Sequence, residues 1–270
     1  MEIAFEKKGI PFDTPGFYDH PNFIKQEQRD PRFLELYAEY VESRAYDFDY
    51  LTAAEQKITI AASALESAVR ADGRLGACVD VSGMLGRILD RLGVWNYVAK
   101  ATLTITFPKP SGISIRYFWN FDVGEFVAPH AMVVAPPFGV VDLTARKQAY
   151  SSGEPDHIPN IILAKEWSLG SWKPEDLANP IILADLHRRR ISFDTFMNEV
   201  RPDTANIIQS LPVRIVQEGE TTFKYVIVAV GGTIEPLEGV TGYRPGGRTA
   251  LEIFEQAILP TVHSPESNQG

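Results

Sequence analysis

Cys78 is the only cysteine in this chain of 270 residues, and it stands where a thiol could act as a nucleophile. It follows a loop over residues 72–77 and opens a segment whose apolar residues recur at helical spacing, which predicts a helix over residues 78–92. At a helix start, unpaired backbone N–H groups and the positive end of the helix dipole favour the thiolate over the thiol. Because the thiolate is the reactive form, this position favours nucleophilic catalysis by Cys78.

His130 and Asp142 are the residues that could activate this thiol. His130 begins an apolar segment typical of a strand, and Asp142 lies near the end of the next such segment. The midpoint of the two positions is Pro136, inside the turn that joins the segments, so an antiparallel hairpin would bring them nearly opposite one another. A carboxylate beside an imidazole favours the imidazolium, which in turn favours the thiolate. The three residues therefore predict acyl transfer through a cysteine nucleophile.

These residues and their surroundings resemble the transglutaminase-like superfamily, a circularly rearranged branch of the papain-like cysteine enzymes. The resemblance covers about residues 50–150, and its motifs are Gly76-Ala77-Cys78, Leu92-Gly93, His130-Ala131 and Asp142-Leu143-Thr144. It implies an α+β papain-like core in which a helix-borne cysteine packs on an antiparallel sheet, with Cys78, His130 and Asp142 as the catalytic residues. The chain departs from the family at Met132, commonly an aromatic residue, and at Leu143, commonly a proline.

Two further features concern how a substrate would be held. The backbone N–H of Cys78 could stabilise an oxyanion, and such a site usually has a second donor, for which Gln56 and Asn120 are candidates. Trp119 and Met132 are candidates for the wall of a substrate groove, although core packing is the alternative for aromatic and apolar residues of this kind.

The remaining pattern predicts an N-terminal segment over residues 1–50, a catalytic core over 51–150 and a C-terminal α+β extension over 151–270, with one integrated domain left open. The first 30 residues are expected to be extended or turning. Thr52 and Glu55 suggest a capping box for the second helix. Helices are expected over residues 32–44, 53–70, 78–92, 179–190, 192–200 and 249–259. Strands are expected over 101–107, 113–121, 130–135, 140–144, 211–217 and 222–230. The polar tail over 263–270 is expected to be disordered.

Composition narrows the function classes. A net charge of −9 argues against general nucleic-acid binding, which needs a basic face. A single cysteine excludes an intrachain disulfide and zinc sites that need several thiolates, and the histidines lack metal-ligand spacing, so neither metal nor cofactor is expected. No signal peptide or membrane span is evident, which favours the cytoplasm, with delivery by a route without a signal left open.

The sequence leaves several alternatives open. With water as acceptor the chemistry is that of a peptidase, amidase or deamidase acting on a protein, peptide or small amide; with an amine it is that of a transglutaminase. Hydrolysis is favoured because water is the default acceptor. The rival is a catalytically inactive papain-like binding module. In that case Cys78 is a small core hydrophobe, His130 merely starts a strand and Asp142 is a solvated carboxylate.

Overall fold

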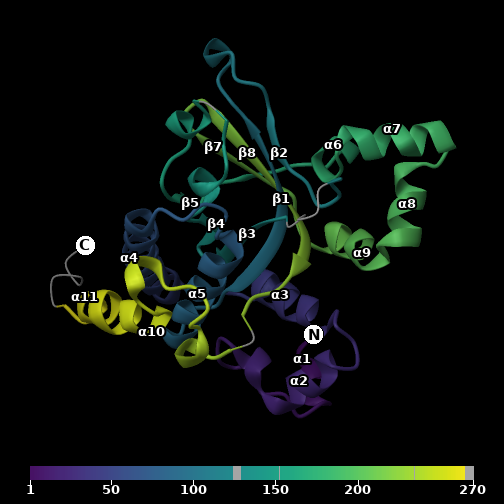
Figure 1. The fold of residues 1–270 in the computed structure, drawn as a ribbon. Helices are drawn as coiled ribbons and strands as arrows, with labels where there is room; N and C mark the ends of the chain where they lie inside the picture. Colours follow the sequence, from purple (N-terminus) through teal and green to yellow (C-terminus); the bar gives the residue numbers. More distant parts are fainter. Residues whose placement is uncertain (124–128, 152, 234, 265–270) are drawn as a thin grey trace.

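The computed structural model describes residues 1–123, 129–151, 153–233 and 235–264; most of the predicted disordered tail lies outside these residues. Their strands form one curled antiparallel sheet in the order β5-β4-β3-β1-β8-β7-β6, with β2 beside β1 (Figure 1). Helices cover both faces, so the chain is an α+β protein. The strands are β1 (Tyr97–Thr106), β2 (Arg116–Phe118), β3 (His130–Ala135), β4 (Phe138–Asp142), β5 (Ile162–Ala164), β6 (Ser168–Leu169), β7 (Arg214–Glu218) and β8 (Thr221–Val230).

One face of the sheet is covered by the helices α4 (Phe48–Asp72) and α5 (Cys78–Arg91), which the sequence predicted within a few residues. Their buried apolar residues form a cluster with β3 and β4. The predicted capping box at Thr52 is wrong, because α4 begins earlier, where the Asp47 carboxylate accepts a hydrogen bond from the Tyr50 N–H at 2.7 Å. Gly73 ends α4 in a left-handed conformation (φ +75°), which turns the chain toward Cys78.

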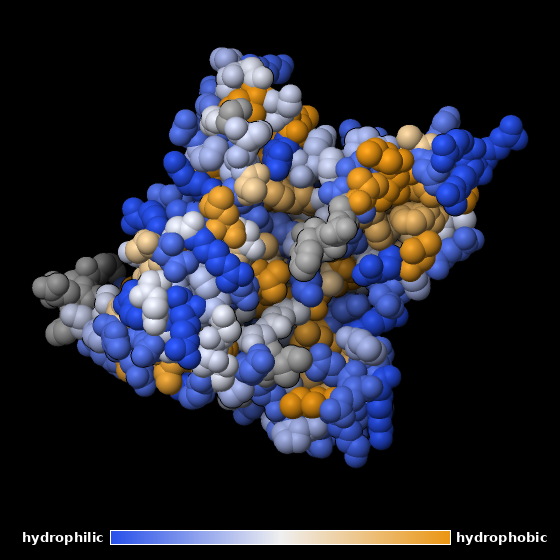
Figure 2. All heavy atoms as spheres, viewed as in Figure 1, coloured by the Kyte–Doolittle hydropathy of each residue, from blue (hydrophilic) through white to orange (hydrophobic). Residues whose placement is uncertain are grey.

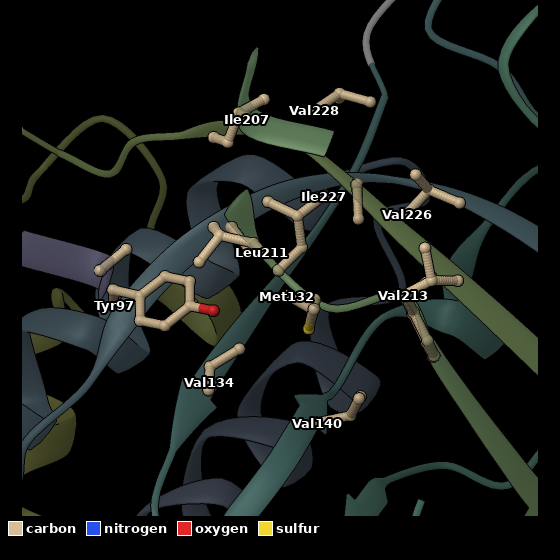
Figure 3. Close-up of a cluster of buried hydrophobic side chains, with 14 of the residues drawn as sticks. Tyr97, Met132, Val134, Val140, Ile207, Leu211, Val213, Val226, Ile227 and Val228 are labelled. Atoms are coloured by element: carbon tan, nitrogen blue, oxygen red, sulfur yellow. The ribbon is translucent and has the colours of Figure 1, made fainter. Parts of the chain in front are cut away.

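The other face is covered by α3 (Phe33–Ser43) and α9 (Pro202–Ser210). Figure 3 shows part of this core, in which Met132 and Val134 of β3 lie among residues of β8 and α9. The short helices α1 (Glu2–Glu6) and α2 (Pro21–Glu27) pack below α3. The sequence did not predict α1, α2 or α9, because α1 and α2 are held by aromatic packing, such as Phe5 on Phe17 at 5.1 Å, and not by a helical repeat.

The C-terminal segment contributes to the same sheet. β8 lies between β1 and β7, so the centre of the sheet joins strands far apart in the sequence. The helices α6 (Pro174–Leu177), α7 (Pro180–Arg189) and α8 (Phe193–Val200) extend to one side, and Figure 2 shows apolar side chains gathered on their surface. The predicted final helix is the continuous run of α10 (Ala250–Ile253), a π-helical turn (Phe254–Ile258) and α11 (Leu259–Val262). The 3-10 turns are Phe17–Asp19, Lys109–Ser111, Ala145–Lys147, Glu154–His157, Leu237–Gly239 and Pro245–Gly247.

The strand predicted over residues 113–121 is much shorter in the structure. β2 spans only Arg116–Phe118, and it lies on the same edge of β1 as β3 does. Phe118 pairs with Leu103, and His130 pairs with Ala101 two residues away. β3 therefore occupies the edge that a longer β2 would need, and the chain leaves the sheet after Phe118. This end-to-end arrangement places β2 directly beside the start of β3.

None of the helices in the described residues is long and apolar enough to cross a membrane.

Gly86 determines how closely α5 approaches β1. A Cβ atom at Gly86 would lie 2.8 Å from the Cγ2 atom of Val98 and 3.3 Å from the side-chain oxygen of Asn96. Because valine is stiff about its first side-chain torsion, this clash would push the helix from the sheet. We expect Gly86→Ala to lower the free energy of unfolding by about 1–3 kcal/mol, the usual cost of overpacking, measured by urea denaturation.

Gly83→Ala is the matched control. A Cβ atom there meets its nearest neighbour, the backbone nitrogen of Thr233, at 3.4 Å, an ordinary contact. Alanine also has the higher helix propensity, so this variant should be as stable as the wild type or slightly more stable. Equal stability of the two variants would contradict the close approach.

Candidate active site

The structure brings His130 and Asp142 together. The Nε2 atom of His130 lies 2.6 Å from the Oδ2 atom of Asp142, and both side chains are fully buried. The observed pairing of Val133 with Val141 differs from the predicted register by two residues, because continuing it sets Asp142 opposite Met132. His130 is therefore a diagonal neighbour of Asp142 on the same face, which an imidazole and a carboxylate can bridge.

Asp142 is held as a carboxylate by five hydrogen-bond donors, the weakest of which is the Thr144 hydroxyl, 3.3 Å from Oδ1. Its Oδ1 atom accepts bonds from the backbone N–H groups of Thr144 at 2.8 Å and Ala145 at 2.9 Å. Its Oδ2 atom accepts bonds from His130 and from the hydroxyl of Tyr225 at 3.0 Å. Burial alone would raise the pKa of Asp142, but the charge of His130 and these bonds outweigh it, so the pKa is lowered. Asp142 is thus neither solvated nor free to rotate.

Tyr225 is a site residue that the sequence did not reveal. It lies on β8, 83 residues from Asp142 along the chain, and reaches the carboxylate because β8 pairs with β1. Its ring centre lies 6.5 Å from that of His130. No local motif marks it, since it occupies one of several alternating apolar positions in a strand. Only the order of strands in the sheet could have identified it.

Cys78 occupies the first position of α5, as predicted, and is 7% exposed. The loop before it is tied to the site, because the Gly76 N–H donates to the carbonyl of Lys147 at 2.8 Å, just after Asp142 and Thr144. Burial raises the pKa of the Cys78 thiol, but interaction with His130 and a hydrogen bond from the Ala131 N–H outweigh it, so the net pKa is lowered. The thiol is thereby biased toward the thiolate.

His130 is biased toward the imidazolium. Burial lowers its pKa, but the charge of Asp142, the hydrogen bond to it and the interaction with Cys78 raise the pKa to about 10. Since Nε2 is bound to Asp142, the thiol interacts with Nδ1. Among the described residues, Nδ1 is buried and makes no bond with the full geometry of a hydrogen bond. The lowered pKa of Cys78 and the raised pKa of His130 together favour a thiolate–imidazolium pair, with one ring nitrogen of His130 held by Asp142.

The two predicted oxyanion donors lie in different surroundings. Gln56 is on the exposed side of α4, about 24 Å along the helix from the end that leads to Cys78. Its neighbour Lys57 binds the carbonyl of Leu92, past the far end of α5. The structure therefore does not bring Gln56 to the thiol. Asn120 lies just beyond β2, and among the described residues its side-chain nitrogen is buried without a hydrogen-bond partner.

The two predicted groove residues, Met132 and Trp119, both pack against other residues of the chain. Met132 is fully buried in the core between β3, β8 and α9, so it does not form the wall of a groove (Figure 3). Trp119 stacks on Tyr117 with ring centres 5.4 Å apart, and its ring N–H donates to the carbonyl of Glu175 at 2.9 Å. The ring of Phe118 lies beside the site, with its centre 6.1 Å from that of His130.

A cavity elsewhere in the described residues and the residue types that can ligate a metal bear on where the site lies. A cavity of about 430 Å³ lies between the N-terminal helices, α5 and the ends of β1 and β8, and it shares no residue with the Cys–His–Asp group. No cluster of three or more histidine, cysteine, aspartate or glutamate side chains in the described part of the chain could hold a metal ion. We place the candidate site at Cys78 because three titratable groups converge there with shifted pKa values.

Comparison with protein-family models, curated proteins and solved structures finds no match to this chain. The case for chemistry at Cys78 therefore rests on the residues and geometry described above.

The shifted pKa values of His130 and Cys78 make the free energy of unfolding depend on pH. The raised pKa of His130 stabilises the fold fully below the unfolded value of about 6.5, and this contribution is lost as pH rises through about 10. The lowered pKa of Cys78 stabilises the fold above the unfolded value of about 8.5, and this contribution is lost as pH falls. If the folded chain holds the thiolate and the imidazolium between about pH 6.5 and 8.5, folded and unfolded chains each hold one proton on the pair, and the pH dependences of the two contributions cancel.

Cys78→Ser should remove this cancellation. Only the His130 contribution remains, so the free energy of unfolding of the variant should fall relative to wild type by about 1 kcal/mol per pH unit across the same window. Urea denaturation of both proteins at three pH values measures the difference between their free energies of unfolding. The contributions of all other titrating groups cancel in this difference. Parallel pH profiles would mean that the thiol carries no charge in the folded protein.

Proposed function

We propose that this protein is a cysteine-dependent acyl-transfer enzyme that attacks an amide through Cys78 and forms a thioester. The observation that carries the proposal is the buried group of Cys78, His130 and Asp142, in which the pKa of the thiol is lowered and that of the imidazole is raised. A structural cysteine in an apolar core has the opposite shift, because burial alone raises the pKa of its thiol.

The chemistry follows from the protonation states. The Cys78 thiolate attacks the carbonyl carbon, and the carbonyl oxygen becomes an oxyanion. The His130 imidazolium gives its proton to the leaving nitrogen as the C–N bond breaks, which leaves a thioester and a neutral imidazole. His130 then takes a proton from water, which attacks the thioester, and the C–S bond breaks to restore the thiolate and imidazolium. The sum is one amide and one water converted to a carboxylic acid and an amine.

Asn120 is the proposed second oxyanion donor. Asn120 stands two residues after Phe118, whose ring lies beside His130. Its side-chain nitrogen is buried without a hydrogen-bond partner among the described residues. A buried amide nitrogen without a partner is costly, so such groups in native structures call for an explanation. An oxyanion that appears only during the reaction would supply the missing acceptor. The first donor is the Cys78 N–H, which has no partner within the helix at this position.

Hydrolysis is the proposed outcome, by a peptidase, amidase or deamidase in preference to a transglutaminase, because water needs no binding site of its own. The order of the helix-borne cysteine and the two strands supports a papain-like, transglutaminase-like core for this part of the chain. The cytoplasm is the proposed compartment, since a thiol nucleophile stays reduced there.

Alkylation by iodoacetamide tests the activation of the thiol. Because the chain has one cysteine, total labelling measures Cys78 directly. An ordinary thiol with a pKa of about 8.5 reacts slowly at pH 6. We expect the wild type to be labelled at pH 6 at nearly its pH 8 rate, and His130→Gln to lose most of the labelling at pH 6. Mass spectrometry over a pH series provides the measurement.

Glutamine at position 130 keeps a hydrogen-bond donor for the buried Asp142 carboxylate, and near-ultraviolet circular dichroism checks that the variant is folded. Labelling of the wild type that appears only near pH 8 would contradict the proposal. It would favour the inactive binding module, in which the fold is retained without the chemistry.

The role of Asn120 is separable from that of the thiol. With 4-nitrophenyl acetate as acyl donor, Asn120→Ala should slow acetylation of Cys78 by about 10²-fold, the usual effect of removing one oxyanion donor. Alkylation by iodoacetamide passes through no oxyanion and should be unchanged. Release of 4-nitrophenolate and the acetyl mass on Cys78 provide the two readouts. Gln56→Ala removes the same kind of side chain far from the site and should leave both rates unchanged; equal effects of the two variants would exclude Asn120.

A further inference from the structure

The edge of the candidate site carries a row of nitrogen groups that the protein leaves open. Arg116 and Phe118 lie on the same face of β2, the face on which Phe118 meets His130, and Asn120 follows in the bend after the strand. Among the described residues, two nitrogen atoms here are buried without a hydrogen-bond partner: Nε of Arg116 and Nδ2 of Asn120. Native proteins seldom leave such groups unsatisfied without a functional reason.

Arg116 is the charged member of this row. Its guanidinium lies 5.5 Å from the ring centre of Phe118 and 5.9 Å from that of Tyr150, and these two rings are nearly perpendicular to each other. Its one hydrogen bond among the described residues runs from Nη2 to the carbonyl of Ala149 at 3.0 Å. It forms no ion pair with any described carboxylate. Within the described ranges Arg116 is thus a cation without a paired carboxylate, in a chain whose net charge is −9.

The nearby carboxylates are already engaged elsewhere. Asp142 is bound by His130, Tyr225 and two backbone N–H groups. The Glu154 side chain accepts a hydrogen bond from the Ser151 hydroxyl at 3.3 Å. Neither carboxylate forms an ion pair with Arg116, so as far as the described residues go the guanidinium keeps N–H groups of Nη1 and Nη2 for an external anion.

We propose that Arg116 forms an anion subsite and that the substrate is an amide that carries a carboxylate close to the scissile bond. This inference rests on the proposed acyl-transfer function and adds the substrate class to it. The guanidinium edge matches the two oxygens of a carboxylate, and the contacts with the two rings keep the group beside the site. The row would then bind the substrate carboxylate at Arg116 and the oxyanion at Asn120, with the acyl carbon at Cys78 beside His130.

Paired alkylating probes test this inference. The probes are N-iodoacetyl glycine, β-alanine and 6-aminohexanoate, each compared with its neutral methylamide. Wild type should react faster with the carboxylate than with the matched amide at one spacer length, by about fivefold for a half-exposed ion pair. Arg116→Gln should reduce this ratio to about one, and Arg116→Lys, which restores the charge without the planar edge, should give an intermediate ratio. The rate with iodoacetamide should be unchanged in both variants.

Arg74→Gln is the matched control for the general electrostatic field. It removes the same charge four residues from Cys78, but that guanidinium is already paired with Asp80 at 3.2 Å. The ratio should therefore stay at the wild-type value in this variant. A wild-type ratio of one at every spacer, or equal losses in the two arginine variants, would overturn the anion subsite.

The two proposals fail in distinguishable ways. Absence of iodoacetamide labelling at pH 6 would count against the activated thiol. The probe ratio can also be measured at pH 9, where an ordinary thiol is largely ionised, and a ratio of two rates at one pH does not depend on the ionised fraction of Cys78. A preference for the carboxylate at pH 9 without labelling at pH 6 would support the anion subsite and contradict the acyl-transfer function.

Discussion

The hydrogen bond between Asp142 and His130 is the interaction on which the arrangement of the site depends. Both side chains are fully buried, and a buried carboxylate is tolerated only when its charge is compensated and its oxygens are bonded. Backbone N–H groups and Tyr225 satisfy the remaining acceptor capacity of Asp142, which leaves the ring of His130 one permitted orientation. Nδ1 is then the nitrogen available to Cys78. The position of the thiol follows from how the carboxylate is buried.

This burial requires parts of the chain that are far apart in sequence. β8 brings Tyr225 to Asp142, and the same strand pairs with β7, where the fully buried Arg214 forms an ion pair with Glu42 of α3. The Tyr97 hydroxyl donates to Glu42 at 2.6 Å and connects this pair to β1. The C-terminal strands therefore form one structural unit with the strands that carry His130 and Asp142. The segment of β7 and β8 contains no chemical motif of its own, but it buries the residues whose pKa values are shifted.

The features that the sequence predicted are those determined locally. The start of α5 follows from the glycine-containing loop and the apolar repeat, and the hairpin that joins His130 to Asp142 follows from two apolar runs around adjacent prolines. The features that were missed depend on the order of strands. Tyr225 enters through a pairing between distant strands, Met132 is buried because β3 has a covered second face, and β2 is short because β3 occupies its edge. The amide residues show the same limit. Gln56 and Asn120 have equivalent chemistry in the sequence, and only the fold distinguishes an exposed residue of α4 from a half-buried one after β2 whose amide nitrogen is buried.

In the candidate site the hydrogen-bond acceptors of Asp142 all have donors, whereas some buried donors have no acceptor among the described residues. Both oxygens of Asp142 are bonded, whereas the buried side-chain atoms without a hydrogen bond along β2 and the bend after it are nitrogen atoms, in the part of the chain that the structure describes. A core that merely tolerated a buried histidine would be expected to satisfy donors and acceptors alike, because each buried unpaired group costs about 1–3 kcal/mol. Donors therefore exceed acceptors at this edge of the site, and a ligand with several oxygen acceptors would supply the missing partners. An amide carbonyl that becomes an oxyanion, together with a carboxylate, is a ligand of that kind. The unpaired donors thus give a reason for the location of the thiolate that is independent of the pKa of Cys78.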